Sequence, residues 1–175
     1  MSGPGSAFNV LGPYSPERVT PLEDAELARE IAVVAATYPT KQAALLPALW
    51  KVQHKYGHIS PEAQAFVAGV LEITPAHVQG AVTFYTLFKT RPMGKYHIQV
   101  CRTLSCAIGG NEQVIEHLQR KLGIHPGEVT SDGRFSLVLV ECLGACGYAP
   151  MFQINDDYHE HLTIETIDAL LETLR

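Results

Sequence analysis

Cysteine is the residue whose spacing is most informative in this sequence. Each of two cysteine pairs directly follows a stretch that has the pattern of a β-strand, over residues 96–100 and 135–141. If these strands are neighbours that end at the same sheet edge, the thiols converge, and converging thiolates in a reducing compartment predict a metal site. The chain has only four cysteines, spaced as C-x4-C, 35 residues, then C-x3-C: Cys101, Cys106, Cys142 and Cys146.

Three interpretations of these cysteines differ in their chemistry. Buried cysteine often serves as a small apolar side chain. Here, however, all four cysteines lie at the ends of predicted strands and are flanked by glycine, which is not typical of core residues. Redox dithiol chemistry normally needs C-x-x-C at a helix N-terminus, and neither pair has that spacing. A four-thiolate zinc centre tolerates spacings of two to four residues. Spacing alone therefore leaves zinc and iron–sulfur open.

The segments around the cysteines favour iron–sulfur over zinc. A [2Fe–2S] core with four thiolates carries a net negative charge that grows on reduction, so backbone N–H groups directed at sulfur stabilise it. The segment 104–110 leads into a predicted helix N-terminus, whose unpaired N–H groups favour negative charge. Small residues surround Cys146 in the segment 143–147, which allows the backbone to approach a cluster closely.

The elements that must position these cysteines form an α/β pattern in the C-terminal half. A helix is expected over residues 111–122, ended by Gly123, and the apolar run 135–140 is typical of a strand that is covered on both faces. Residues 151–154 and 158–161 form a predicted hairpin, and Thr163 caps a last helix. The order β-α-β-β-α predicts a mixed sheet with helices packed on it.

Upstream, residues 20–85 have the pattern of a small bundle of four helices. Thr20, Pro21 and Glu23 predict a capped helix start, and Ser60-Pro61 and Thr74-Pro75 repeat the cap-then-proline device. A second helix is expected over residues 41–56, with Pro47 in its first two turns and Gly57 as its end. The expected inner faces are Leu27, Ile31, Val34 and Tyr38; Ala44, Leu45, Ala48, Leu49, Val52 and Tyr56; and Val78, Ala81, Val82 and Tyr85.

Composition and charge set limits on function. The chain of 175 residues is 46% apolar and 18% charged, with a net charge of −5, which fits a globular protein and disfavours a nucleic-acid-binding surface. No apolar run is long enough to span a membrane, and the N-terminus lacks a signal-peptide pattern, so we expect a cytoplasmic protein. The division expected is a flexible arm over residues 1–19, a helical bundle over 20–92 and an α/β domain over 93–175.

Several motifs together resemble a known family. They are CRTLSCAIGG at 101–110, PGEVTSDG at 126–133 and VECLGACGYAPM at 140–151, with LWKVQHKYGHI at 49–59 and HVQGAVTFY at 77–85 upstream. This combination is similar to the E-type, thioredoxin-like [2Fe–2S] subunit of NADH:quinone oxidoreductase (respiratory complex I) and of related NAD-linked dehydrogenases. The similarity extends over about residues 22–175, nearly all of the chain except the arm.

The resemblance implies a ligand set, a fold and a function. Cys101 and Cys106 would bind one iron of a [2Fe–2S] cluster and Cys142 and Cys146 the other, in a thioredoxin-like domain where Pro150 occupies the family's cis-proline place. The cluster would exchange one electron with the FMN of a neighbouring subunit, which also carries the NADH site and a [4Fe–4S] cluster. This chain would hold no nucleotide, in agreement with the lack of a G-x-G-x-x-G motif.

The resemblance also implies partners and a location. The helical bundle would dock on the FMN- and NADH-binding subunit, beside larger iron–sulfur subunits of the peripheral arm, at the inner face of the bacterial cell membrane and without inserting into it. The isolated chain should not oxidise NADH. Equivalent subunits of NAD-dependent formate dehydrogenases and NAD-linked hydrogenases are an alternative, and a zinc-stabilised docking subunit without redox activity is an alternative from another class.

Three further groups of residues have both a functional and a structural interpretation. His159 and His161 have the spacing of metal ligands on a strand, but we expect an exposed hairpin there. Arg102, between the first two cysteines, either offsets cluster charge or is solvated. For a set of aromatic residues we expect mainly core packing, with one or two of them used in docking: Trp50, Tyr56, Phe84 and Tyr85.

Overall fold

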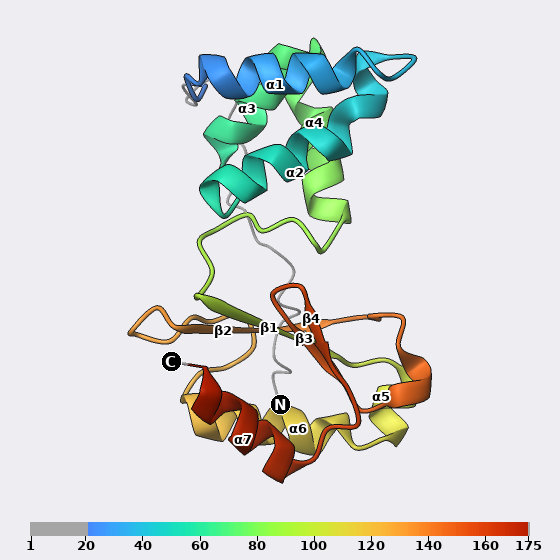
Figure 1. Cartoon of the computed structure of the whole chain (residues 1–175), viewed down its shortest axis with the longest axis vertical. Helices are drawn as coiled ribbons and strands as arrows, with labels where there is room; N and C mark the ends of the chain where they lie inside the picture. Colours follow the sequence, from blue (N-terminus) through green and yellow to red (C-terminus); the bar gives the residue numbers. More distant parts are fainter. Residues whose placement is uncertain (1–20, 175) are drawn as a thin grey trace, which may run out of the picture. The chain divides into compact units, whose positions relative to one another are not determined.

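The structure, a computed structural model, describes residues 21–174 as two compact units, 21–92 and 93–174 (Figure 1). The first unit is helical and the second is mixed α/β, as the sequence predicts. The arm expected over residues 1–19 and the hydroxyl cap expected at Thr20 lie outside the described residues. Among the residues described, no helix combines the length and the apolar character that a membrane crossing requires.

The first unit consists of four α-helices and one short 3-10 helix. Their bounds are α1 Ala25–Ala35, η2 Lys41–Ala44, α2 Leu45–Tyr56, α3 Pro61–Leu71 and α4 Pro75–Phe84. The cap-then-proline prediction is confirmed for α3 and α4, where the hydroxyls of Ser60 and Thr74 accept hydrogen bonds from the N–H groups of Ala63 and His77.

The predicted start of the first helix is wrong. Pro21 and Glu23 precede the helix, and the N-cap is Asp24, whose carboxylate accepts a hydrogen bond from the Leu27 N–H at 3.0 Å. The same carboxylate also binds the Lys55 ammonium at 2.8 Å and the Tyr56 hydroxyl at 2.6 Å. Asp24 thus joins the start of α1 to the end of α2, a tertiary contact that a local capping pattern does not contain.

The second predicted helix divides into two parts. Residues Lys41–Ala44 form a 3-10 turn, and α2 then begins at Leu45, so Pro47 is its third residue. At that place its missing N–H costs nothing, because the first N–H groups of a helix have no partner within the helix. Gly57 ends α2 in the left-handed conformation at φ +77°, as predicted.

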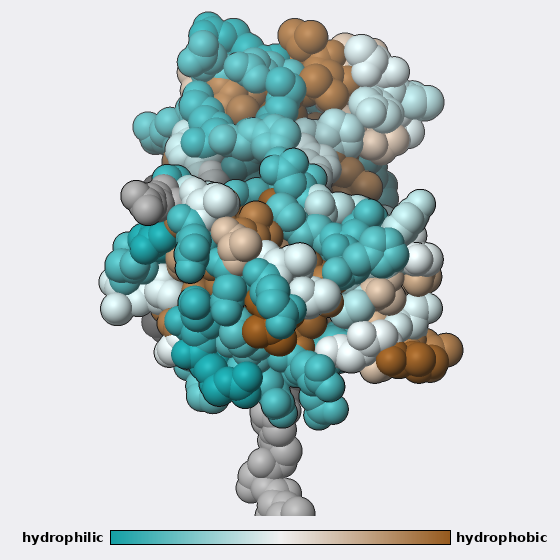
Figure 2. Space-filling view, turned by 60° about the horizontal axis from the view of Figure 1, so that its bottom comes forward, coloured by the Kyte–Doolittle hydropathy of each residue, from teal (hydrophilic) through white to brown (hydrophobic). Residues whose placement is uncertain are grey.

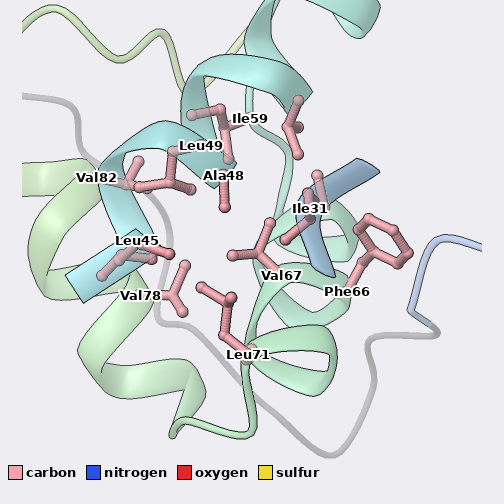
Figure 3. Packing of buried hydrophobic residues seen from close by; sticks show 14 of the residues in the cluster. Ile31, Leu45, Ala48, Leu49, Ile59, Phe66, Val67, Leu71, Val78 and Val82 are labelled. Atoms are coloured by element: carbon pink, nitrogen blue, oxygen red, sulfur yellow. The ribbon is translucent and has the colours of Figure 1, made fainter. Parts of the chain in front are cut away.

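The core of the first unit is formed by the inner faces of its helices (Figure 3). It includes Ile31 of α1, Leu49 of α2, Val67 of α3 and Val82 of α4, all shielded from solvent. The prediction that most of the aromatic set packs in the core is wrong, as is the inward placement of Tyr38. Trp50 is partly buried against this core, but several aromatic side chains are exposed: Tyr38, Tyr56, Phe84 and Tyr85.

The second unit is built on a four-stranded mixed sheet in the order β2-β1-β3-β4. Strand β1 pairs in parallel with β2, and β3 pairs antiparallel with both β1 and β4. The predicted strands and long helices are present, but the observed order β-α-α-β-β-β-α has one strand and one short α-helix more than the expected β-α-β-β-α, and a 3-10 turn besides. The elements are β1 Tyr96–Cys101, α5 Leu104–Ile108, α6 Asn111–Leu122, β2 Phe135–Val140, η3 Cys146–Tyr148, β3 Phe152–Ile154, β4 Asp157–His159 and α7 Ile164–Thr173.

Helices α6 and α7 lie on the same side of this sheet (Figure 1). Val114 and Leu118 of α6 and Ile167 of α7 join the buried strand residues in one apolar core. Strand β2 lies at an edge of the sheet, and only part of it is fully buried, so the expected cover on both faces is incomplete. Seen toward α6 and α7, the surface is mostly hydrophilic (Figure 2), as expected for the outer faces of amphipathic helices.

The Asp24 contacts predict an acid-sensitive contribution to the stability of the first unit. The Leu27 N–H, Lys55 and Tyr56 hold the pKa of Asp24 well below its ordinary value of 3.8. A depressed folded-state pKa stabilises the fold above the unfolded pKa, and this stabilisation is lost as pH falls toward the folded value. Asp24→Asn keeps a capping side chain but not the charge. The stability advantage of wild type over Asp24→Asn should therefore shrink below about pH 4.

Urea unfolding midpoints of both proteins, measured between about pH 6 and pH 2.5, provide this comparison. Glu23→Gln is the control, because it removes a neighbouring exposed carboxylate that makes no cap. An advantage of wild type over Asp24→Asn that stays constant throughout the acid range would contradict the assignment.

Candidate metal centre

The parallel pairing of β1 and β2 brings the two cysteine segments to one edge of the sheet. In the register of this pair Cys101 lies opposite Val140, so Cys142 follows only two residues beyond the paired strands. The Arg102 N–H donates to the Val140 carbonyl at 3.0 Å and extends this alignment past the strand ends. The expectation that both strands end at the same edge is confirmed.

Cys101 and Cys106 are the buried members of the set. Cys101 ends β1, and Cys106 lies within α5, with exposed fractions of 3% and 2%. Both contact the buried Met151 in a small apolar cluster, with Leu143, Ala145 and Ala149 packed against it. Residues 104–110 lead directly into α6, whose N-cap is Gly110, as expected. What the sequence did not indicate is α5, a separate helical segment that contains the buried Cys106.

Cys142 and Cys146 are exposed and belong to the second cysteine loop, residues 141–150. Cys146 begins η3, which contacts α5, so the elements that carry Cys106 and Cys146 are neighbours. Gly144 lies between them at φ +81°, a conformation that other residues rarely adopt. Its N–H donates to the Cys142 sulfur at 3.4 Å. All four cysteines are free thiols.

The pKa values of the two buried cysteines shift in opposite directions. Burial raises the pKa of Cys101, but hydrogen bonds from the Thr103 hydroxyl, the Thr103 and Leu143 N–H groups and Cys106 outweigh it, and the net shift of this pKa is downward. Burial and the hydrogen bond to Cys101 raise the pKa of Cys106 to about 11. The opposite shifts reflect the hydrogen bond between the two sulfurs. The Cys101 thiol also donates to the Glu141 carbonyl at 3.6 Å.

An ion pair joins the beginnings of the two cysteine loops. The Arg102 Nε donates to Glu141 Oε1 at 3.0 Å, and its Nη2 binds the same oxygen. Neither interpretation offered for Arg102 is complete, because this side chain is neither free in solvent nor reserved for a cluster. It ties the residue after Cys101 to the residue before Cys142.

The β3–β4 hairpin and the turn after it hold the rest of the second cysteine loop. The Tyr158 hydroxyl donates to the Leu143 carbonyl at 2.6 Å, and the His161 N–H donates to the Tyr148 carbonyl at 2.9 Å. The Leu162 N–H donates to the carbonyl of Pro150, which follows a cis peptide bond, as its place in the family pattern implies. The loop is thus held by residues that follow it in the chain, in β4 and in the turn after β4.

The two histidines of this hairpin are occupied by ring contacts. The His159 ring packs on Phe152, and the His161 ring on Tyr148, with centroids 5.5 and 5.4 Å apart. Burial lowers the pKa of His159. Among residues 21–174, no three Cys, His, Asp or Glu side chains converge closely enough to hold a single metal ion.

The four thiols fit a two-iron cluster in the chemistry of their donors. The cysteines come in two pairs at one sheet edge, as two irons with two thiolates each require. Backbone N–H groups point at three of the four sulfurs: Leu143 at Cys101, Met151 at Cys106 and Gly144 at Cys142. Such N–H groups stabilise negative charge on sulfur.

Comparison with protein families decides the relationship. The model of the family described as thioredoxin-like [2Fe-2S] ferredoxin matches residues 31–175. The chain belongs to this family. The cofactor that gives this ferredoxin family its name is one [2Fe–2S] cluster, and the mixed α/β fold agrees with the family's thioredoxin-like architecture.

Relatives of this chain include subunits of NADH-quinone oxidoreductase. The "E 2" subunit of NADH-quinone oxidoreductase from Rhizobium meliloti (strain 1021) is 45% identical over 83% of this chain and 87% of the relative. NADH-quinone oxidoreductase subunit 2 of Thermus thermophilus is 46% identical over 80% of this chain and 79% of the relative.

A solved structure of an NAD+-reducing [NiFe]-hydrogenase in the air-oxidised state matches 74% of this chain with a TM-score of 0.65 and 27% identity. The match spans only 22% of that hydrogenase chain. The similarity to the hydrogenase therefore concerns one part of a much longer protein.

Three features that shape the site were not predicted from the sequence. Thr103 hydrogen bonds to Cys101, Gly109 lies against the loop at Pro150, and Tyr158 holds Leu143. A signal for Gly109 was present, because two consecutive glycines indicate close backbone approach or a turn. Nothing near Tyr158 in the sequence indicates that its hydroxyl reaches a carbonyl 15 residues away.

Gly109 provides a test of how closely the cysteine loops pack. A Cβ at this position would lie 3.1 Å from the Pro150 nitrogen and 3.2 Å from the Ser105 carbonyl oxygen. We expect Gly109→Ala to lower the free energy of unfolding by about 1–3 kcal/mol, because backbone has to move. Gly147→Ala, with open space at its Cβ, should change it by less than about 0.5 kcal/mol. Equal effects in urea unfolding would contradict the packing.

Proposed function

We propose that Cys101, Cys106, Cys142 and Cys146 bind one [2Fe–2S] cluster, the first two on one iron and the last two on the other. We further propose that the chain is the electron-transfer iron–sulfur subunit of an NADH:quinone oxidoreductase. The observation that carries the proposal is the placement of two free cysteine pairs at the ends of two paired parallel strands, in a chain whose family is a [2Fe–2S] ferredoxin.

The relatives support complex I over the alternatives. Those named as NADH-quinone oxidoreductase subunits are 45% and 46% identical, and this chain spans most of their length. The hydrogenase match is 27% identical and spans a small part of that chain. An equivalent role in an NAD-linked hydrogenase or formate dehydrogenase is the second candidate. A zinc-stabilised docking subunit is the third candidate. It is less favoured because zinc requires four ligands around one ion, and no three candidate ligands converge among residues 21–174.

The residues of this chain bind the cluster, orient its ligands and shield it from water, and none of them has to exchange a proton. The bound cluster supplies reversible one-electron transfer. Cys101 and Cys106 exclude water from their side of the site through burial against Met151. The backbone N–H groups of Leu143, Met151 and Gly144 offset negative charge on the sulfurs. The Arg102–Glu141 pair and the Tyr158 hydrogen bond fix the loops that carry the ligands.

The partners proposed are an FMN- and NADH-binding subunit, which also carries a [4Fe–4S] cluster, and larger iron–sulfur subunits of the peripheral arm. An apolar rim beside the cysteines suits close approach by an electron donor or acceptor. Leu104 and Ile108, one helical turn apart in α5, are 75% and 80% exposed. In Figure 2 an apolar group protrudes at the side of the molecule where Figure 1 places α5.

The helical unit, residues 20–92 in the proposed division, is assigned to partner docking. Phe84 is 77% exposed and Val33 69%, and such side chains are stabilised by burial against another protein. The location proposed is the inner face of the bacterial membrane, peripheral, as part of the complex.

The cluster assignment is tested by spectrum, metal content and ligand substitution. Protein isolated without oxygen should be red-brown, contain two irons and two sulfides per chain and bleach with dithionite. Cys106→Ser and Cys142→Ser should lose or distort the cluster, whereas Ser105→Ala, beside Cys106, should keep it. Colourless wild-type protein with one zinc would overturn the proposal, and an unchanged EPR signal and iron content in both serine variants would refute the ligand set.

The parent complex is tested by affinity purification of the full chain from its own cells. We expect co-purification of a subunit that contains FMN and oxidises NADH, within an assembly that reduces quinone. Nickel in the assembly would assign the chain to a hydrogenase, and cluster reduction by formate would assign it to a formate dehydrogenase. The purified chain alone should not oxidise NADH.

A further inference from the structure

The second cysteine loop contains a hydrogen-bond relay that runs from the sheet to a cysteine sulfur. The Tyr158 hydroxyl donates to the Leu143 carbonyl at 2.6 Å. This carbonyl belongs to the same peptide unit as the Gly144 N–H, which donates to the Cys142 sulfur at 3.4 Å. One rigid, planar peptide group is therefore held at its oxygen by Tyr158 while its nitrogen faces the proposed ligand.

We propose that Tyr158 is a positioning residue that orients the Leu143–Gly144 peptide toward Cys142 and so raises the reduction potential of the proposed cluster. This inference rests on the proposed function, because it concerns a sulfur assigned there as an iron ligand. Tyr158 itself does not contact a cysteine.

The physical basis is the charge on sulfur. An N–H donor directed at a ligand sulfur stabilises the more negative, reduced state more than the oxidised one, and therefore raises the potential. A hydrogen bond to the carbonyl of a peptide polarises the group and strengthens the donor at its other end. Loss of the Tyr158 hydroxyl thus weakens the Gly144 N–H as a donor and frees the peptide to rotate.

Tyr158 is suited to this role because its own backbone is fixed. It lies in β4, where it pairs with Gln153 of β3, and Gln153 pairs in turn with Gln99 of β1. The peptide it holds lies in a loop and needs such an anchor. Gly144 at φ +81° has little steric restraint of its own. The Tyr158 hydroxyl provides the hydrogen bond that reaches this peptide from the sheet.

The test compares the full chain, purified with its cluster, as wild type, Tyr158→Phe and Tyr148→Phe. Tyr148 is the matched control, because its exposed fraction is 52% against 50% for Tyr158, and it lies in the same loop as the peptide. Its hydroxyl makes no hydrogen bond to any residue that the structure describes. The measurements are iron and sulfide per chain, the EPR spectrum and an EPR-monitored redox titration.

We expect all three proteins to hold two irons, with a lower potential in Tyr158→Phe alone. At a fixed ambient potential near the midpoint, the ratio of reduced to oxidised cluster should fall about threefold to tenfold, where tenfold corresponds to 59 mV for one electron. The EPR g values should shift in the same variant, because one sulfur changes its hydrogen bonding. An unchanged potential in iron-replete Tyr158→Phe, or an equal shift in Tyr148→Phe, would overturn the inference.

A second variant keeps the test open if Tyr158→Phe loses iron. Site-specific replacement of Tyr158 by 3-fluorotyrosine retains the hydroxyl and makes it a stronger donor, so the potential should rise above that of wild type. A potential that is unchanged or lower in this protein would overturn the inference. Failure of the proposed function is distinguishable, because then the wild-type chain itself would hold no [2Fe–2S] cluster.

Discussion

The parallel pairing of β1 with β2 is the constraint on which the site depends. Parallel strands end at the same sheet edge, so the two cysteine pairs lie beside each other although 35 residues separate Cys106 from Cys142 in the chain. The register sets Cys101 opposite Val140 and leaves two residues before Cys142. A shift of the register by one residue would change the spacing between the two cysteine pairs and reverse which side chains of the shifted strand face the core. The helices α6 and α7 fix this register by covering the apolar face of the strands.

The site combines a buried half with an exposed half, and the two halves have different physical requirements. Cys101 and Cys106 lie in an apolar cluster, where negative charge on sulfur is costly unless N–H groups face it. Thr103, Leu143 and Met151 supply such groups from the backbone. The other two cysteines lie in a solvent-exposed loop. Desolvation of their sulfurs is therefore small, and the main requirement is that the loop keeps one conformation. The Arg102–Glu141 ion pair and the Tyr158 hydrogen bond to Leu143 stabilise that conformation, because they connect the loop to the end of β1 and to β4.

Local patterns in the sequence were sufficient for the elements whose causes are local. Ser60 and Thr74 cap their helices, Gly57 and Gly123 end theirs in the left-handed conformation, and the hairpin turns at Asn155. Each of these depends on a few adjacent residues. The two strands could also be recognised locally, from the alternation or the apolar character of their residues. Because each cysteine pair directly follows one of these strands, both pairs could be expected at one edge of the sheet.

Features that depend on residues far apart in the chain appeared only in the folded structure. Asp24 caps α1 while it binds Lys55 and Tyr56, Arg102 pairs with Glu141 across 39 residues, and Tyr158 reaches Leu143. Most of the aromatic side chains expected in the core are exposed, because periodicity identifies a helix face but not whether a neighbouring helix covers it. Sequence patterns thus specified most of the helices, the strands and the four thiols. Packing across the chain specified which thiols are buried and which contacts orient them, because those contacts exist only between segments that folding brings together.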